Sequence, residues 1–416
     1  MNTFSRRHFL KLVGTSAALA ATPMLLKAQT AASGRVVIVG GGFAGATAAK
    51  YLRHWSSGNV DVTLVDANPE HVSCILSNLA LNGSLGLSQI TFNYEALQQK
   101  YGVTVLKGRA VGAGNGQLLL EDGRKLDYDR LILAPGIDFA PIPGLDMDRI
   151  PHAWQAGPQT TLLKNQLKDM PPGGVFVLTI PPAPYRCPPG PYERACLVAD
   201  YLKRNKPGSK VIVLDANSKI IAEEHTFRKA FEQTHAGIIE YHPNVLLKEV
   251  DSTNRVAKTS QGNFKASVLN VLPPQKAGKI VFNLGLTEGN WAPVNPLTYE
   301  STASGAEGIH IIGDSQGTSQ PKSGHIANSE AKVCADAILR AFAGEAPDPA
   351  PTTNSACYSP ITAKTASWLT AVFAYDPETR AMKPVPEAFG EAPDATKENY
   401  EKMFDWASNL FADTFA

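Results

Sequence analysis

The sequence predicts an α/β protein with two dinucleotide-binding-type, Rossmann-like domains and a C-terminal α+β domain. Three observations lead to this prediction. A glycine-rich turn joins an apolar strand to a helix within residues 35–52. A second pair of apolar strands is expected at 175–180 and 210–215, and a Pro/Ala-rich linker at 344–353 sets the C-terminal segment apart. Strands that alternate with helices are typical of parallel sheets covered by helices.

The first thirty residues are expected to be a targeting segment rather than part of the fold. Ser5–Lys11 contains two adjacent arginines, and the apolar run Leu12–Leu26 follows it. A charged segment before an apolar one is typical of a signal peptide, and paired arginines are typical of the twin-arginine (Tat) class. A membrane anchor is the alternative, but the run is short for a span of about 20 residues. We therefore expect residues 1–30 to be a signal peptide and the folded protein to be exported to the periplasm.

Charge and composition argue against several classes of partner. The chain has 39 basic and 38 acidic residues and no basic block, whereas nucleic-acid binding needs a basic face. No stretch after the leader is apolar enough to span a bilayer. His71, His242 and His325 show no metal-ligand spacing. We expect no nucleic-acid partner, no transmembrane segment and no metal.

The turn Gly40–Gly45, GGGFAG, contains the glycine pattern of a dinucleotide site. It follows a buried-type strand and precedes an alanine-rich helix. Gly40 permits the tight turn, Gly42 lets the backbone approach a pyrophosphate, and Gly45 lets helix and strand pack closely. The next apolar strand ends in Asp66, whose carboxylate is expected to accept hydrogen bonds from ribose hydroxyls. A glycine turn without a ligand is the alternative.

Two later segments decide which dinucleotide is expected. One apolar strand is followed by Pro135-Gly136, where the chain can come close to the dinucleotide, and a later one ends in Gly313-Asp314. The arrangement resembles the flavoproteins of the glutathione-reductase-like fold, which have two dinucleotide domains. The resemblance implies FAD in the first domain and places Asp314 at its ribityl and phosphate region. A simple helix cap at Asp314 is the alternative.

The second dinucleotide-type domain lacks a glycine turn. Its first two strands are expected at Val175–Ile180 and Lys210–Asp215, but residues 181–189, which follow the first, contain five prolines. Proline has no N–H for a phosphate, and its ring blocks a close approach. A nicotinamide dinucleotide is therefore not expected to bind there in the usual manner, and electrons must reach or leave the flavin by another route.

The cysteines indicate that route. The chain has five: Cys74, Cys187, Cys196, Cys334 and Cys357. An odd number in an exported protein requires an explanation. Cys196 and Cys334 fall on apolar helical patterns, where a cysteine is usually a small buried hydrophobic residue. That leaves three cysteines, next to turn or polar residues, as candidates for chemistry.

The Tat-type leader, the Cys74 segment, RCPPGPYERA at 186–195 and the extension with Cys357 together resemble the flavoprotein subunit of flavocytochrome c sulfide dehydrogenase. The likeness runs over essentially the whole mature chain. It implies that the sulfur of Cys74 is joined covalently to the 8α-methyl group of FAD. It also implies that Cys187 and Cys357 form a redox-active disulfide beside the flavin ring, and that Glu193 is the acid–base group.

The residues by themselves leave alternatives open. Cys74 can be a buried structural cysteine, and a bridge between Cys187 and Cys357 can be purely structural. Glu193 at a helix start can simply interact with the helix dipole. The missing glycine turn and the rigid proline loop around Cys187 favour a redox role. Arg186 is expected to favour the anionic state of the neighbouring thiol.

The expected reaction is the oxidation of hydrogen sulfide to sulfur or polysulfide. Hydrosulfide would open the disulfide to a persulfide and a thiolate, and the thiolate would then reduce the flavin. The chain has no C-x-x-C-H haem motif, so the resemblance implies a separate c-type cytochrome subunit as acceptor. The aromatic-rich segments 368–375 and 403–411 are expected to cover the flavin site and an interface, or to be plain core.

Three other functions remain possible on the sequence. A sulfide:quinone oxidoreductase shares the fold and the cysteine chemistry, a non-catalytic assembly protein would keep FAD as a structural group, and an NADH-dependent disulfide reductase would need a nicotinamide site. The expected domains are an FAD domain at 34–145 and 280–347, an inserted domain at 146–279, and a C-terminal domain at 348–416 that covers the flavin site and docks the cytochrome.

Overall fold

The structure is a computed structural model that describes residues 33–416, so the predicted signal peptide lies outside the described residues. Its first sheet is parallel, with the strand order β19-β9-β1-β2-β5. The strands are β1 (Gly34–Val39), β2 (Val60–Asp66), β5 (Thr104–Lys107), β9 (Arg130–Leu133) and β19 (Ile309–Ile311). The central strands are apolar runs such as VVIV, as expected for a sheet buried on both faces.

Helices cover one face of this sheet, and a small antiparallel sheet covers the other. The helices are α1 (Phe43–Trp55), α2 (Glu95–Tyr101) and α7 (Gly324–Phe342). The small sheet consists of β6 (Ala110–Gly114), β7 (Gln117–Leu120) and β8 (Lys125–Asp127), next to α6 (Lys279–Asn283). Helices α1 and α7 pack closely because α1 is rich in alanine and glycine.

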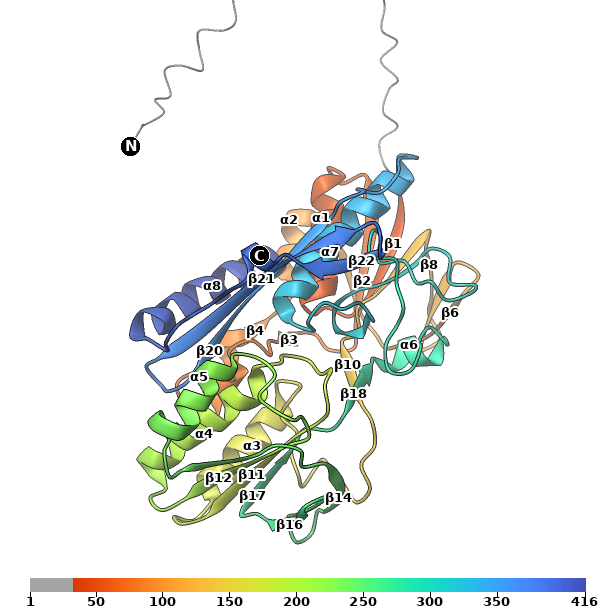
Figure 1. Cartoon of the computed structure of the whole chain (residues 1–416). Coiled ribbons are helices and arrows are strands. Elements are labelled where there is room, and N and C mark those ends of the chain that lie inside the picture. The colour runs from red at the N-terminus through yellow and green to blue at the C-terminus, as the bar shows by residue number, and fades with distance from the viewer. Residues whose placement is uncertain (1–32) are drawn as a thin grey trace, which may run out of the picture. The chain divides into compact units, whose positions relative to one another are not determined.

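The second sheet is also parallel, in the order β13-β12-β11-β17. Its strands are β11 (Val175–Ile180), β12 (Lys210–Asp215), β13 (Ile239–His242) and β17 (Val268–Val271). Helices α3 (Pro158–Asp169), α4 (Gly190–Asn205) and α5 (Glu224–Lys229) share one core with it. The hairpin sheet β14 (Leu247–Asp251), β15 (Val256–Thr259) and β16 (Gly262–Lys265) packs on the other face. These elements occupy the lower part of Figure 1.

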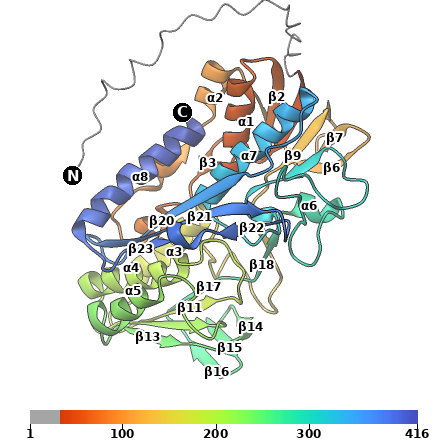
Figure 2. The same cartoon turned by 45° about the horizontal axis from the view of Figure 1, so that its top comes forward.

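The C-terminal part forms an antiparallel sheet and one long helix. The strands are β20 (Thr352–Pro360), β21 (Ala366–Asp376), β22 (Ala381–Pro384) and β23 (Gly390–Glu391), followed by α8 (Lys397–Phe415). Strand β20 contacts α7 of the first sheet and α4 of the second, and α8 packs on β21 and α1. Figure 2 shows this sheet passing across both parallel sheets, with α8 beside it.

Short elements complete the fold. Strands β10 (Ile137–Phe139) and β18 (Gln275–Ala277) pair antiparallel where the chain passes between the two parallel sheets. The others are β3 (His71–Val72), β4 (Thr91–Phe92), η1 (Ser77–Ala80), η2 (Leu87–Ile90), η3 (Ala230–Thr234), η4 (Gly313–Ser315) and η5 (Pro386–Ala388). The predicted fold class, two Rossmann-like sheets with an α+β C-terminal part, is confirmed. Within residues 33–416, no helix has both the length and the hydrophobicity that crossing a bilayer requires.

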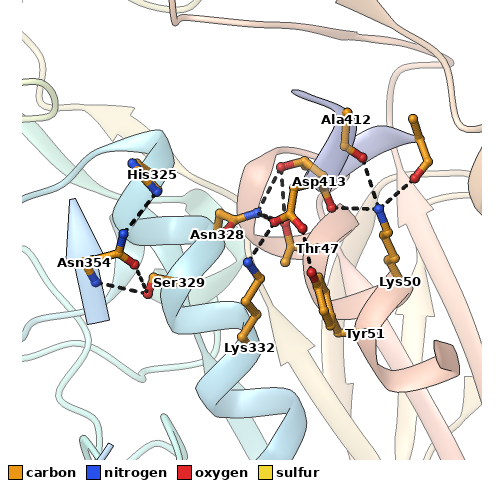
Figure 3. A network of polar contacts seen from close by, with 12 residues as sticks. Thr47, Lys50, Tyr51, His325, Asn328, Ser329, Lys332, Asn354, Ala412 and Asp413 are labelled. Carbon is orange, nitrogen blue, oxygen red and sulfur yellow. Dashed lines mark hydrogen bonds and ion pairs between the residues drawn. The ribbon is translucent and has the colours of Figure 1, made fainter. Parts of the chain in front are cut away.

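The C-terminal helix is fixed to α1 and α7 by a polar network (Figure 3). Lys50 Nζ donates to the carbonyl oxygens of residues 412, 413 and 416 in the last turn of the helix, at 2.7–3.0 Å. The last carbonyls of a helix lack the full set of intrahelical donors. The Asp413 carboxylate accepts from Tyr51 at 2.5 Å and Asn328 at 2.8 Å, and pairs with Lys332 at 2.8 Å. Helix α8 is therefore held at its last turn by charge-assisted hydrogen bonds.

Candidate active site

Three of the five cysteines line one pocket. Cys74 follows β3, Cys187 lies in the turn between β11 and α4, and Cys357 is in β20. All five cysteines of the chain are free thiols in this structure. Cys196 and Cys334 are fully buried in α4 and α7, as the apolar helical patterns around them indicate. The fold thus separates the cysteines into two packed in helices and three that face a shared space.

The proline loop holds Cys187 rigidly. Residues 181–189 have four backbone N–H groups, and three of them donate to protein acceptors. Ala183 N–H donates to Asn217 Oδ1 at 3.0 Å, Arg186 N–H to Gln275 Oε1 at 2.8 Å, and Cys187 N–H to the carbonyl of residue 322 at 2.7 Å. Three of the loop's four backbone N–H groups are therefore bonded to the protein and are not available to a phosphate.

Backbone strain gathers around the pocket. Leu76, Ala153 and Cys187 all line it, and all have positive φ, at +66°, +47° and +58°. Such conformations cost on the order of 1–3 kcal/mol each and are kept where the surroundings enforce them, often at functional sites. A Cβ on Gly190 would lie 2.7 Å from the sulfur of Cys187. The first residue of α4 must therefore be glycine to leave room for the thiol.

Glu193 is buried beside these cysteines, in a network with two polar side chains. Asn78 Nδ2 donates to Glu193 Oε1 at 2.9 Å, and Arg194 Nε donates to Asn78 Oδ1 at 2.9 Å. Arg194 Nη1 also donates to His152 O at 2.8 Å and Asn270 Oδ1 at 3.0 Å. Because Arg194 can only donate, it fixes which end of the Asn78 amide faces the carboxyl group. Glu193 is thus held in place, which a helix-dipole role alone does not require.

Burial keeps protons on these groups. It raises the pKa of Glu193 to about 8, although the hydrogen bond from Asn78 opposes the shift. Burial likewise raises the pKa of the thiols of Cys74 and Cys187, and that of Cys357 to about 12. In this reduced structure the cysteines are therefore neutral near pH 7, and a thiolate forms only if a proton leaves to a neighbouring group.

Arg186 acts on the Cys187 thiol in the expected direction, although its charge alone does not make the thiol anionic. The Arg186 charge does lower the pKa of Cys187, but burial and the Glu193 carboxyl group outweigh it. Arg186 instead pairs with Asp314, at 3.7 Å between Nη1 and Oδ2, with both side chains largely buried. The guanidinium thus interacts with Asp314, at the edge of the first sheet, more than with the thiol.

The residues at the carboxyl edge of the first sheet fit FAD. A Cβ on Gly45 would lie 1.8 Å from Gly40 O, so α1 and β1 approach as closely as the dinucleotide turn requires. Several buried polar atoms near this edge have no hydrogen bond to the protein: His71 Nε2, Arg186 Nη2 and Asp314 Oδ1. Buried polar groups are nearly always hydrogen-bonded in the functional state, so these atoms are candidates for cofactor contacts.

The other predicted cofactor residues lie at the same edge. Asp66 Oδ2 accepts from Gly41 N–H at 2.6 Å, so this carboxylate meets the glycine turn that contains Gly42. Ser315 Oγ donates to Gly136 O at 2.5 Å, which joins the Pro135-Gly136 turn to the segment that begins at Gly313. Asp314 is not a helix cap, since it lies in η4 and faces Arg186.

The second sheet offers no usual nicotinamide site. Asp215 ends β12, the position at which the corresponding Asp66 ends β2, and it is fully buried. Its Oδ2 accepts from Tyr192 OH at 2.8 Å and Tyr241 OH at 2.9 Å, and its Oδ1 accepts from Asn217. The carboxylate that would receive a ribose is therefore already engaged by the protein.

Comparisons with known proteins agree with this geometry. Residues 160–273 match the family model "Sulfide dehydrogenase (flavocytochrome c) flavoprotein chain, central", and residues 349–415 match "Flavocytochrome c sulphide dehydrogenase, flavin-binding". The sulfide dehydrogenase (flavocytochrome c) flavoprotein chain of Chlorobaculum thiosulfatiphilum is 52% identical over 44 residues, 11% of this chain and 90% of that sequence. The chain belongs to the flavocytochrome c sulfide dehydrogenase flavoprotein family. It is accordingly an FAD-containing, sulfide-oxidising flavoprotein.

More distant relatives cover most of the chain. Residues 34–168 match the model "Pyridine nucleotide-disulphide oxidoreductase". The mitochondrial sulfide:quinone oxidoreductase of Dictyostelium discoideum is 22% identical over 400 residues, 89% of this chain and 82% of that one. The solved sulfide:quinone oxidoreductase of Aquifex aeolicus has a TM-score of 0.74 at 16% identity, covering 92% of each chain. The putidaredoxin reductase–putidaredoxin complex has a TM-score of 0.62 at 21% identity, covering 82% of this chain and 81% of that one. These structures show the shared fold.

Sequence reasoning missed several residues of the site. Asn78 lies in the Cys74 segment and Trp154 in a segment without a motif, and only the fold brings them to Glu193 and Cys187. Arg194 lies within the distinctive RCPPGPYERA segment, but its burial cannot be predicted from that sequence. Lys322 is buried too: its carbonyl accepts from Cys187 N–H, and its ammonium lies 3.8 Å from the centre of the Trp291 ring.

Proposed function

We propose that this chain is the flavoprotein subunit of a periplasmic, Tat-exported sulfide dehydrogenase. In this proposal it oxidises hydrogen sulfide to sulfur or polysulfide through a Cys187–Cys357 redox disulfide, and a c-type cytochrome subunit accepts the electrons. The observation that carries the proposal is the convergence of Cys74, Cys187, Cys357 and the protonatable Glu193 on one pocket. Family membership supplies the substrate class.

The chain's own residues account for the sulfur chemistry. Hydrosulfide attacks one sulfur of the disulfide, the S–S bond breaks, and the products are a persulfide on one cysteine and a thiolate on the other. The proline loop fixes the position of Cys187, so little conformational entropy is lost when the bridge forms again. Glu193 takes up the proton that neutral hydrogen sulfide brings into the pocket. When bound, FAD supplies a two-electron acceptor that can give up its electrons one at a time.

Apolar and aromatic side chains form one part of the pocket wall and suit neutral hydrogen sulfide and sulfur chains, whereas Arg186, Glu193 and Arg194 form a polar part. Trp154, Pro189, Pro360 and Trp406 line the pocket with the cysteines. Water is largely excluded from such a site, which strengthens the interactions of charges that form within it. Of the two aromatic C-terminal segments, 403–411 thus contributes to the pocket wall through Trp406.

Covalent attachment of FAD through Cys74 is part of the proposal. Cys74 is half-buried, lines the pocket and follows the segment that contains His71, whose ring faces the first turn of α1. The test is to denature the protein in acid, digest it and look for a flavin on the peptide that contains Cys74. Flavin that separates completely from the peptides would contradict this part and leave the sulfide chemistry standing.

A quinone acceptor is the second candidate, because the likeness to sulfide:quinone oxidoreductases extends over about nine-tenths of the chain. One experiment distinguishes a cytochrome acceptor from a quinone acceptor. Protein reduced anaerobically with sulfide is mixed either with an oxidised c-type cytochrome or with a soluble short-chain quinone. We expect fast reoxidation by the cytochrome and slow reoxidation by the quinone. The reverse order would overturn the cytochrome proposal.

A further inference from the structure

A second buried carboxyl group, Glu223, lies behind the cysteine pocket and has no role in the reaction described so far. It follows β12, directly before α5, and is 4% exposed. Its φ is +49°, the left-handed region that non-glycine residues seldom occupy. The neighbouring Glu224, by contrast, is partly exposed and pairs with Lys219 and Arg228. The chain thus holds one of two adjacent glutamates inside the protein at the expense of backbone strain.

The hydrogen bonds of Glu223 are incomplete. Ser359 Oγ donates to its Oε2, and Ser367 also interacts with the carboxyl group, whereas Oε1 is buried with no hydrogen bond of normal geometry. Within residues 33–416, no lysine, arginine or histidine forms an ion pair with it. A buried carboxylate with no cation and a free oxygen is costly. A structural carboxylate would be paired, so this arrangement suits a group that changes its protonation state.

Strand β20 connects Glu223 to the cysteine pocket. Side chains two residues apart on a strand point to the same face, so Ser355, Cys357 and Ser359 form one row. Ser355 Oγ lies 4.0 Å from the sulfur of Cys357 at one side of it, and Ser359 holds Glu223 at the other. The carboxyl group therefore lies at the end of the row that contains the reactive sulfur.

We propose that Glu223 is a second proton-holding group of the sulfide-oxidising site, which compensates the charge of Cys357 as Glu193 compensates that of Cys187. The inference rests on the proposed function. In the balanced step, hydrogen sulfide gives its proton first to Glu193, and the proton ends on Glu223. Hydrogen sulfide, the Cys187–Cys357 disulfide and the Glu223 carboxylate thus give a cysteine persulfide, a thiolate on Cys357 and the protonated Glu223 carboxyl group, with Glu193 unchanged. One S–S bond breaks and one forms, the disulfide is reduced, and the substrate proton ends on the carboxylate. Net charge in the buried pocket stays constant. Because Glu223 acts through Ser359 and the field at Cys357, it is a positioning residue.

The surrounding charges agree with this role. Burial raises the pKa of Glu223 to about 7, and the hydrogen bonds from Ser359 and Ser367 limit the rise. The titratable groups that interact with it lie on three elements: Glu193 and Cys196 on α4, Cys357 on β20, and Glu391 on β23. All of them are acids. After burial, the Glu223 charge is the largest cause of the raised pKa of Cys357. Formation of a thiolate at Cys357 and protonation of Glu223 therefore favour each other.

The test is infrared difference spectroscopy of the FAD-containing protein before and after the disulfide is opened with dithiothreitol. Dithiothreitol is used so that the result does not depend on whether sulfide is the substrate. We expect the wild type to gain the C=O band of protonated carboxyl groups, and Glu223→Gln to lose one component of that band. Glu224→Gln, the matched control next to it in the chain, should keep the full band. A Glu223→Gln spectrum identical to that of the wild type would overturn the inference.

Two further measurements test the inference in case Glu223→Gln does not fold or gives no clear spectrum. Ser359→Ala keeps the carboxyl group and removes its hydrogen bond, so the band component of Glu223 should shift in frequency; no shift would count against the inference. In the reduced protein, Glu223→Gln should also lower the pH midpoint for alkylation of Cys357 by iodoacetamide, by about one unit. Unchanged alkylation would overturn the coupling, whereas failure of sulfide to reduce the wild-type flavin would refute the proposed function instead.

Discussion

Glu193 combines burial with a single hydrogen bond to its carboxyl group, and this sets how the reaction depends on pH. Its pKa is raised to about 8 because it is desolvated. As a proton acceptor it works only when ionised, so the rate of flavin reduction by sulfide should rise as pH increases through about 8. Glu193→Gln should be about 100-fold slower and lose this rise. Stopped-flow absorbance across the pH range measures both effects, and an unchanged profile would remove Glu193 from the mechanism.

The same group makes stability depend on pH. A carboxyl group whose pKa is higher in the folded than in the unfolded protein binds more protons when folded, so stability falls as pH rises between the two values. For Glu193 this interval runs from about 4.5 to about 8. We expect Glu193→Gln to reduce the loss of unfolding free energy over that interval, as measured by urea denaturation at several pH values. Equal pH dependence in both proteins would contradict the raised pKa.

Asn78 is the residue that joins the Cys74 segment to the acid. Its amide bridges Glu193 and Arg194, both of which are buried. Asn78→Ala would leave a buried acceptor and a buried donor unpaired and should cost about 1–3 kcal/mol of unfolding free energy. Denaturant titration of wild type and variant measures this cost. The exposed Asn254, whose amide bonds only within its own turn, gives a matched control through Asn254→Ala.

At the scale of elements, the proline turn after β11 distinguishes this chain from nicotinamide-dependent relatives of the same fold. Its donors and the Asp215 carboxylate are engaged by the protein. NADH should therefore leave the flavin oxidised under conditions in which sulfide bleaches it, as followed by anaerobic absorbance. Rapid bleaching by NADH would show that a nicotinamide site exists despite this turn.

Helix α8 depends on its last turn for attachment. The pKa of Asp413 is lowered, because hydrogen bonds from Lys332, Tyr51 and Asn328 outweigh the opposing effect of its burial. Asp413→Ala should speed amide exchange throughout α8 and lower the unfolding free energy by about 2 kcal/mol. Asp405→Ala, on the exposed side of the same helix, is the control. Hydrogen exchange with mass spectrometry makes the comparison, and equal protection in both variants would show that the network does not hold the helix.

The elements themselves were largely predictable from the sequence, for physical reasons. The turn at Gly40 and the strand that ends in Asp66 follow local rules of backbone conformation and strand pattern, so their places were foreseen. The hydrogen bond between Asn78 and Glu193 joins residues 115 positions apart. No local sequence pattern predicts a contact between residues so far apart in the chain. The protonation states of the site residues were not predictable either, because they depend on burial, which only the fold determines. The sign of the Arg186 effect on Cys187 was right, but its size against desolvation was visible only in the fold.

At the scale of the whole chain, the site exists because three sheets meet. The first provides the FAD edge, the second the rigid Cys187 loop, and the C-terminal sheet brings Cys357 across to both. Export through the Tat route remains a prediction, and it is consistent with a cofactor that is inserted before transport. A reporter fused after residue 30 that reaches the periplasm only in cells with twin-arginine transport would support it, and Arg6→Lys with Arg7→Lys should block export.

The most direct measurement of the central claim is bleaching of the flavin by sulfide under anaerobic conditions in three proteins. The wild type should bleach rapidly. Cys357→Ser, which keeps the pocket but cannot form the bridge, should retain its flavin and bleach at least about 100-fold more slowly. Cys196→Ser, the buried control in α4, should behave as the wild type does. Bleaching of Cys357→Ser at the wild-type rate would show that sulfide reduces the flavin without the two sulfurs and would contradict the account.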